Sequence, residues 1–213
     1  MARTRTSGQK NPTFIEAARR AQIVSAAIDT IAELGYGQAS LARIAKRAGT
    51  SKGVISYHFA SKDDLIREIA AELLAKAEAY MVPRILAEPS GPGMLRAYIE
   101  SNLAFMREYR NHLVAFLEIF LNARSDDGSP LVDEKSLDYQ VTSLEQLLAH
   151  FQAAGDFRAD FDPQVMALAI RGAINQVPPR LARHPDLDVD GYGRELAALF
   201  DLATRGEPER SEG

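Results

Sequence analysis

The sequence predicts an all-α protein in which a three-helix head with a helix-turn-helix precedes a larger helical bundle. Apolar residues recur at helical spacing from Ala18 to Ala203, and no stretch alternates with the period of a β-strand. Clusters of Gly, Pro and Ser divide these stretches, most clearly at residues 89–93 and 125–130. A composition with 46% hydrophobic and 25% charged residues is ordinary for a globular chain that buries a core.

Residues 41–59 predict two short helices that are joined by a tight turn. The first helix has an apolar stripe at positions i, i+3, i+4 and i+7, made by Leu41, Ile44, Ala45 and Ala48. Gly49 accepts the left-handed backbone that ends a helix, and Thr50 and Ser51 can cap the helix that follows.

The second of these helices separates an inner face from an outer one. Val54, Ile55 and Phe59 point towards the core, whereas the outer residues are Ser51, Lys52, Ser56, Tyr57 and His58. A short exposed helix with a cation, hydroxyls, a phenol and an imidazole suits the major groove of DNA. The alternative is an ordinary αα-hairpin with a solvated face, because helix-turn-helix patterns are loose.

Spaced motifs around the hairpin sharpen this interpretation into a resemblance. They are Ile44-Ala45-Lys46-Arg47-Ala48-Gly49, Ser51-Lys52-Gly53, Tyr57-His58-Phe59 and Ser61-Lys62-Asp63-Asp64-Leu65. Together they resemble the DNA-binding domain of the TetR family of bacterial transcriptional repressors, from about Arg20 to Leu65. The Ile55-Ser56 pair is similar to the branch that contains the choline-responsive repressor of betaine synthesis.

Two positions depart from the family pattern. Many members have a hydrophobic residue in place of Thr50 and a Tyr in place of Ser56. The departure at Ser56 removes one possible contact to phosphate or base and leaves more of the contacts to Tyr57. The expected DNA-binding residues are Ser40, Arg43, Thr50, Ser51, Lys52, Gly53, Val54, Tyr57, His58 and Lys62.

The charge distribution also favours a nucleic-acid partner for the head. The net charge is −4, but residues 1–62 hold ten Lys or Arg against three Asp or Glu, and residues 63–213 hold fifteen against twenty-six. Residues 1–17 are expected to form a basic flexible arm, which either reaches DNA or is a disordered tail. Random drift of surface charge is the alternative explanation of the asymmetry.

The DNA-binding domain is predicted over residues 18–62. Its first helix runs from Ala18 to Leu34 and is stopped by Gly35. Ser61 opens a long fourth helix, with Asp64 completing an approximate capping box, and Lys62 lies where a helix N-terminus and a cation together hold a phosphate. This helix is expected to reach about Met81, where Pro83 breaks or kinks it.

A ligand-binding and dimerisation domain is predicted over residues 63–205, and a disordered tail over 206–213. Further helices are expected at about 94–109, 112–123, 137–155, 163–177 and 192–203. The helix at 112–123 carries apolar residues around nearly its whole circumference, which predicts burial on most sides. The pair Pro178-Pro179 is expected to end the helix before it.

The sequence has no constellation that suggests catalysis. Cysteine is absent, and His58, His112, His150 and His184 do not have metal-ligand spacing. We therefore expect no enzyme activity, no cofactor and no metal. The lack of cysteine fits a reducing cytoplasm, and no apolar run reaches the roughly 20 residues of a membrane helix, so a cytoplasmic protein without a membrane partner is expected.

A small-molecule cavity in the second domain is the remaining expectation. Its candidate lining residues are Phe105, Met106, Tyr109, Phe116, Phe120, Tyr139, Met166 and Asn175, although the apolar ones could equally be plain core. The resemblance implies a homodimeric repressor of a palindromic double-stranded DNA operator, released by a small-molecule effector. A transcriptional activator, a ligand-independent regulator and, more distantly, a helical-bundle enzyme are the alternatives.

Overall fold

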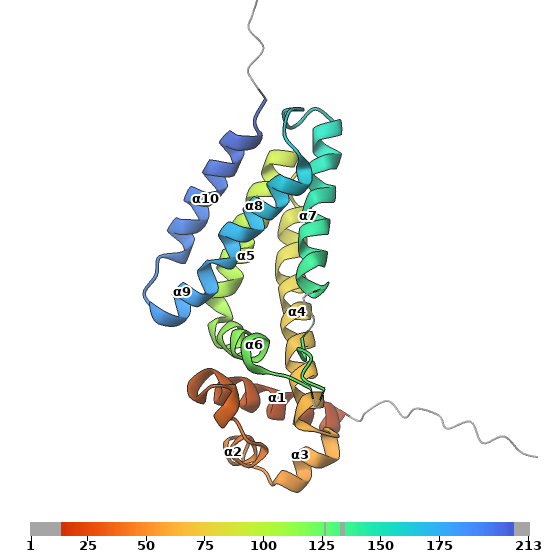
Figure 1. Ribbon diagram of the computed structural model, residues 1–213, viewed down its shortest axis with the longest axis vertical. Coiled ribbons are helices and arrows are strands. Elements are labelled where there is room, and N and C mark those ends of the chain that lie inside the picture. The colour runs from red at the N-terminus through yellow and green to blue at the C-terminus, as the bar shows by residue number, and fades with distance from the viewer. Residues whose placement is uncertain (1–13, 126, 133–134, 207–213) are drawn as a thin grey trace, which may run out of the picture.

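The computed structural model describes residues 14–125, 127–132 and 135–206, and it confirms the all-α prediction. Helices α1, α2 and α3 form a head at one end of the molecule, and the long helix α4 leads from this head into a body of packed helices (Figure 1). The described residues contain no strand, and Arg124 and Pro130 form an isolated β-bridge in a loop.

The head is built from α1 (Phe14–Leu34), a 3₁₀ turn η1 (Tyr36–Gln38), α2 (Leu41–Arg47) and α3 (Lys52–His58). Helix α1 begins at Phe14 rather than at the predicted Ala18. Phe14 is highly exposed, so no apolar stripe marked this first turn and the sequence pattern placed the start too late.

Helix α4 (Lys62–Leu86) begins with the predicted cap. The Ser61 hydroxyl accepts the Asp64 backbone N–H at 3.0 Å, and the Asp64 carboxylate accepts the N–H of Ala60 at 3.1 Å. The expected end near Met81 is wrong, because the helix continues through Pro83 to Leu86. Proline lacks the N–H that would donate a helical hydrogen bond. Pro83 lies in the last turn of α4, so the helix tolerates the loss of this bond there.

Among the described residues, six further helices follow α4 in the body. They are α5 (Gly91–Glu108), α6 (Arg110–Asn122), α7 (Lys135–Ala153), α8 (Pro163–Asn175), α9 (Val177–Arg183) and α10 (Val189–Thr204). Helix α8 ends at Asn175, just before Pro178-Pro179 as expected, and these prolines then occupy the first turn of a new helix, α9. Proline is tolerated there, since first-turn N–H groups have no helical partner.

Two hydrophobic cores hold the molecule together. The head core joins residues of α1 to α4 with Ala115 and Ile119 of α6, so one face of α6 belongs to the head. The body core joins residues of α5, α7, α8, α9 and α10. Helix α10 lies closely along α5, where a Cβ on Gly193 would stand 3.3 Å from the side chain of Leu103.

The prediction that α6 is buried on most sides is only partly right. Ala115 and Ile119 are its two buried residues, Leu121 is exposed, and several of its apolar side chains are half-buried. Four of the half-buried ones, Leu113, Phe116, Leu117 and Phe120, border a cavity, which explains why apolar residues surround a helix that does not pack against protein on all sides.

Candidate DNA-binding surface and ligand cavity

Side-chain caps fix the two helices of the helix-turn-helix. Ser40 accepts the backbone N–H of Arg43 at the start of α2, and Ser51 accepts that of Val54 at the start of α3, both at 3.3 Å. Gly49 has a φ of 60°, which allows the N–H of Thr50 to reach the carbonyl of Ala45 at 2.9 Å. The predicted turn chemistry is therefore confirmed.

Helix α3 presents the polar face that its sequence predicted. Ile55 is fully buried in the head core and Val54 packs against it half-buried. On the outside, Lys52 is exposed and the Tyr57 side chain is 74% exposed, with its hydroxyl donating to Glu16 of α1 at 3.2 Å. Among the expected contact residues, the exposed ones are Ser40, Arg43, Ser51, Lys52, Gly53 and Tyr57, and the half-buried ones are Thr50, Val54, His58 and Lys62.

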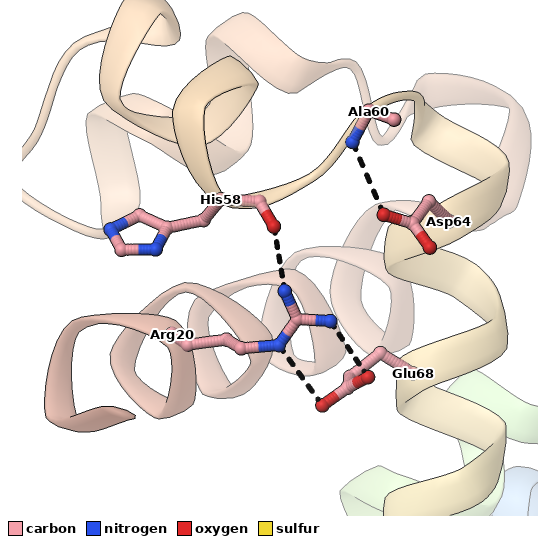
Figure 2. A network of polar contacts seen from close by, with 5 residues as sticks. All are labelled: Arg20, His58, Ala60, Asp64 and Glu68. Atoms are coloured by element: carbon pink, nitrogen blue, oxygen red, sulfur yellow. Dashed lines mark hydrogen bonds and ion pairs between the residues drawn. The ribbon is translucent and has the colours of Figure 1, made fainter. Parts of the chain in front are cut away.

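Arg20 of α1 holds the end of α3 in place, a role that the sequence did not reveal. Figure 2 shows its guanidinium between two elements: Nη1 donates to the carbonyl of His58 at 2.6 Å, and Nε and Nη2 form a bidentate pair with Glu68 of α4. The same guanidinium lies 4.2 Å from the centre of the Phe59 ring. One side chain therefore fixes α3 relative to both α1 and α4.

Lys62 makes its contacts inside the head. Its Nζ donates to the carbonyl of Tyr36 at 3.1 Å and lies 4.0 Å from the centre of the Tyr36 ring. Partial burial lowers the pKa of Lys62, with the charge of Asp63 opposing this shift. Its assignment as a phosphate contact stays a prediction, and the structure adds a competing partner.

The basic residues of the head differ in how far their charge is neutralised. Arg47 pairs with Glu33, with Nη1 donating to Oε1 at 2.9 Å, and Arg43 donates to Gln38. Lys46 and Lys52 are exposed, and neither pairs with a carboxylate among the described residues. These two ammonium groups are therefore the more available ones for phosphate.

An apolar cavity occupies the body between α4, α5, α6 and α8. Its volume is about 320 Å³, and its lining residues are Leu73, Leu74, Ala77, Met81, Asn102, Phe105, Met106, Leu113, Phe116, Leu117, Phe120, Gln140, Arg171, Asn175 and Pro178. A second cavity of about 480 Å³ continues towards α7 and shares Leu74, Ala77, Met81, Asn102, Gln140 and Arg171 with the first. Pockets of this size and composition take small organic ligands.

The structure brings six of the eight expected lining residues to these cavities. Five border the first cavity, namely Phe105, Met106, Phe116, Phe120 and Asn175, and Tyr139 borders the second. Tyr109 is not a lining residue and stacks on Phe105 with ring centres 4.6 Å apart. Met166 packs against the body core instead. Helical spacing places a residue on a face but does not say which neighbour covers that face.

Sequence reasoning missed the polar centre of the cavities, which is Arg171. This residue is only 6% exposed and is hydrogen-bonded to Tyr98, Asn102, Gln140 and Asn175. Burial raises the pKa of Tyr98, and the neighbouring arginine opposes that shift. A signal was present in the sequence.

That signal is the position of Arg171 in helix α8. It falls on the same face as Ala167 and Ile174, four residues after the first and three before the second, and both are buried. A charged residue on the buried face of an amphipathic helix is rare enough to mark a site.

Large apolar side chains lie exposed on α8 and α10. They are Val165, Leu168, Leu199 and Leu202, and Gly172 beside them has open space where a Cβ would stand. Large exposed apolar side chains on two helices of one body are typical of a surface that another protein covers.

The head and the body together define a class of protein, the helix-turn-helix DNA-binding proteins with a helical second domain. Residues 23–69 match the family described as bacterial regulatory proteins, tetR family. Residues 23–69 are therefore similar to the N-terminal DNA-binding domain of that family. Across the described residues, no helix has the length and apolar character to cross a membrane, and no three His, Asp or Glu side chains gather as a metal site would require.

Comparison with known proteins agrees with this match of the N-terminal domain. The HTH-type transcriptional regulator BetI of Cronobacter sakazakii is 32% identical over 109 residues, which span 49% of this chain and 53% of that relative. The matched part is thus about half of the relative's length. The DNA-binding domain is therefore similar to that of BetI, as the Ile55-Ser56 pair suggested.

Two solved structures show the same fold over most of the chain. The fatty acid degradation regulator FadR from Bacillus halodurans is 21% identical, with a TM-score of 0.77 over 92% of this chain and 100% of that one. FadR from Bacillus subtilis, solved in complex with stearoyl-CoA, is 22% identical, with a TM-score of 0.71 over 84% of this chain and 96% of that one.

Proposed function

We propose that this protein is a DNA-binding transcriptional repressor that binds a palindromic operator as a homodimer and is released by a small-molecule effector. The exposed polar face of α3 carries this proposal. Lys52 and Tyr57 project from a short helix that is capped by Ser51 and held at its other end by Arg20, at the tip of a basic head. A helix held in this way suits insertion into a major groove.

A homodimer would follow from the exposed faces of α8 and α10. Val165, Leu168, Leu199 and Leu202 would be covered by the same residues of a second copy, in a two-fold four-helix interface. Two-fold symmetry requires a palindromic operator, whose half-sites are one helical turn, about 34 Å, or a multiple of it apart.

The cavity supports release by a ligand because two of its walls also build the head. Helix α4 contributes Leu73 and Met81 to the cavity and Leu65 to the head core. Helix α6 contributes Phe116 and Phe120 to the cavity, and these two side chains also pack against the head core, to which Ala115 and Ile119 of the same helix belong. A ligand that separates α4 from α6 would change how the head is held.

The required coupling is modest. If the ligand prefers the state that does not fit DNA by 1–3 kcal/mol, operator affinity falls roughly 5- to 150-fold. By thermodynamic reciprocity, operator DNA weakens ligand binding by the same factor. Equal ligand affinities with and without operator would contradict this mechanism.

Selection from a random double-stranded library tests the DNA-binding function directly. We expect the full-length protein to enrich a palindromic site, and Lys52→Ala to weaken binding to that site, as measured by fluorescence anisotropy. Enrichment of no sequence would argue against a DNA-binding function. Transcription in vitro from a promoter that carries the site separates a repressor from an activator, and a ligand-independent regulator would show no response to any cavity ligand.

A further inference from the structure

The most unusual group in the body is the guanidinium of Arg171. It stands where the two cavities meet and borders both of them. Its Nη1 donates to the hydroxyl of Tyr98 at 3.2 Å and to Oδ1 of Asn102 at 3.1 Å, while Nη2 donates to Gln140 and to Oδ1 of Asn175 at 2.8 Å. All four acceptors are neutral.

Arg171 therefore keeps an uncompensated positive charge. No carboxylate among the described residues forms an ion pair with it. The acidic residue bordering the second cavity is Glu78 of α4, which is exposed. A guanidinium does not lose its proton in a protein, so Arg171 cannot reduce the cost of burial by becoming neutral.

A buried charge of this kind is stabilised most by an anion. The planar fork of a guanidinium matches a carboxylate, which it can bind through two parallel hydrogen bonds. The neighbouring groups can adapt to such a guest. The Tyr98 hydroxyl can donate as well as accept, and the amides of Asn102, Gln140 and Asn175 each carry NH₂ donors.

The walls around this polar centre select what is attached to the anion. On the side of α4, α5 and α6 the cavity presents Leu73, Met81, Phe105, Phe116 and Phe120. These side chains favour an apolar body, because burying it removes hydrocarbon from water. A cation would meet the repulsion of Arg171 in a low-dielectric space.

We propose that the cavity binds an organic carboxylate, with its head group on Arg171 and its apolar body against Phe105, Phe116 and Phe120. The inference rests on the proposed function in that this carboxylate is the effector. It excludes a quaternary ammonium compound, such as choline, from the same cavity.

Isothermal titration calorimetry on the full-length protein tests the head group without DNA. The probes are hexanoate, phenylacetate and decanoate, each below any micelle-forming concentration, with decan-1-ol, decyl phosphate and decyltrimethylammonium as matched compounds. We expect at least one carboxylate to bind, and decan-1-ol to bind at least tenfold more weakly than decanoate. No binding by any carboxylate, equal binding of decan-1-ol, or tighter binding of decyl phosphate or of the ammonium compound overturns the proposal.

Substitution of Arg171 tests the residue. Arg171→Gln should weaken decanoate at least tenfold and leave decan-1-ol within about threefold, whereas Arg96→Gln, the same change at an exposed position of α5, should behave as the wild type. Unchanged decanoate binding by a folded Arg171→Gln protein would show that the cluster only joins helices. If that variant does not fold, Arg171→Lys, which keeps the charge, and the wild-type probe series decide.

Operator affinity is measured separately from ligand binding, with and without the carboxylate. A carboxylate that binds through Arg171 but leaves operator affinity unchanged would support the site and contradict the proposed release mechanism. Failure to bind any DNA would contradict the proposed function and leave the calorimetric result standing.

Discussion

Arg20 and Glu68 join the first helix to the fourth through two parallel hydrogen bonds, with Nε to Oε1 at 3.2 Å and Nη2 to Oε2 at 2.9 Å. The pair is partly exposed, so its charge attraction alone contributes little. The pair serves to position α3, because the same guanidinium also donates to the carbonyl of His58 at the end of that helix (Figure 2).

Arg20→Ala should therefore lower the free energy of unfolding by about 1–2 kcal/mol, since it removes three hydrogen bonds and a contact with the Phe59 ring. Urea denaturation measures this change. The matched control is Arg19→Ala, which removes an exposed side chain that, among the described residues, bonds to Gln22, and it should cost less than about 0.5 kcal/mol. Equal effects of the two changes on the free energy of unfolding would mean that the Arg20 contacts do not stabilise the fold.

Lys52→Ala and Lys62→Ala separate two kinds of basic residue. Lys52 is exposed and unpaired among the described residues, so its loss should lower the slope of log affinity against log salt by about one unit per half-site. Lys62 contacts Tyr36. If Lys62→Ala lowers the salt slope by a similar amount, Lys62 contacts a phosphate. If the slope is unchanged and the free energy of unfolding falls, Lys62 acts only through its contact with Tyr36.

The combined change Gly172→Glu and Leu199→Glu should convert a dimer to monomers, because it places charges on the exposed apolar face of α8 and α10. Sedimentation velocity measures the assembly, and operator affinity should fall with it. Leu121→Glu is the control, since Leu121 is also 62% exposed but lies on α6. A dimer that survives the double change would refute this interface.

Stability should decrease as the pH falls below about 6.5, and His112 should account for part of the loss. Burial lowers the pKa of His112, a shift that Glu72 and Asp29 oppose and Lys76 supports. The unfolded chain then binds a proton at a higher pH than the folded one, so acid favours unfolding from the unfolded pKa downwards. We expect His112→Gln to reduce the difference between urea midpoints at pH 7.5 and pH 5.5. An undiminished difference would assign the effect to other groups.

Local signals in the sequence determined the head. Ser40, Ser51 and Ser61 cap helices through their own backbone neighbours, and Gly49 takes a positive φ at the turn. Such contacts join residues a few positions apart, so they can be read from spacing alone. The inward and outward faces of α3 follow from the same helical period.

Only the tertiary structure decided the rest. Whether an apolar helix face meets protein, a cavity or the open surface depends on the relative placement of helices that are distant in the chain. The sequence alone therefore could not show that α6 contributes both to the head core and to the cavity. Nor could it show that Phe105 lines the cavity whereas Tyr109 stacks on Phe105 instead. The polar centre around Arg171 depended most on the tertiary structure. Arg171 gains its partners from α5, α7 and α8, and three helices far apart in the chain meet only when the whole body packs.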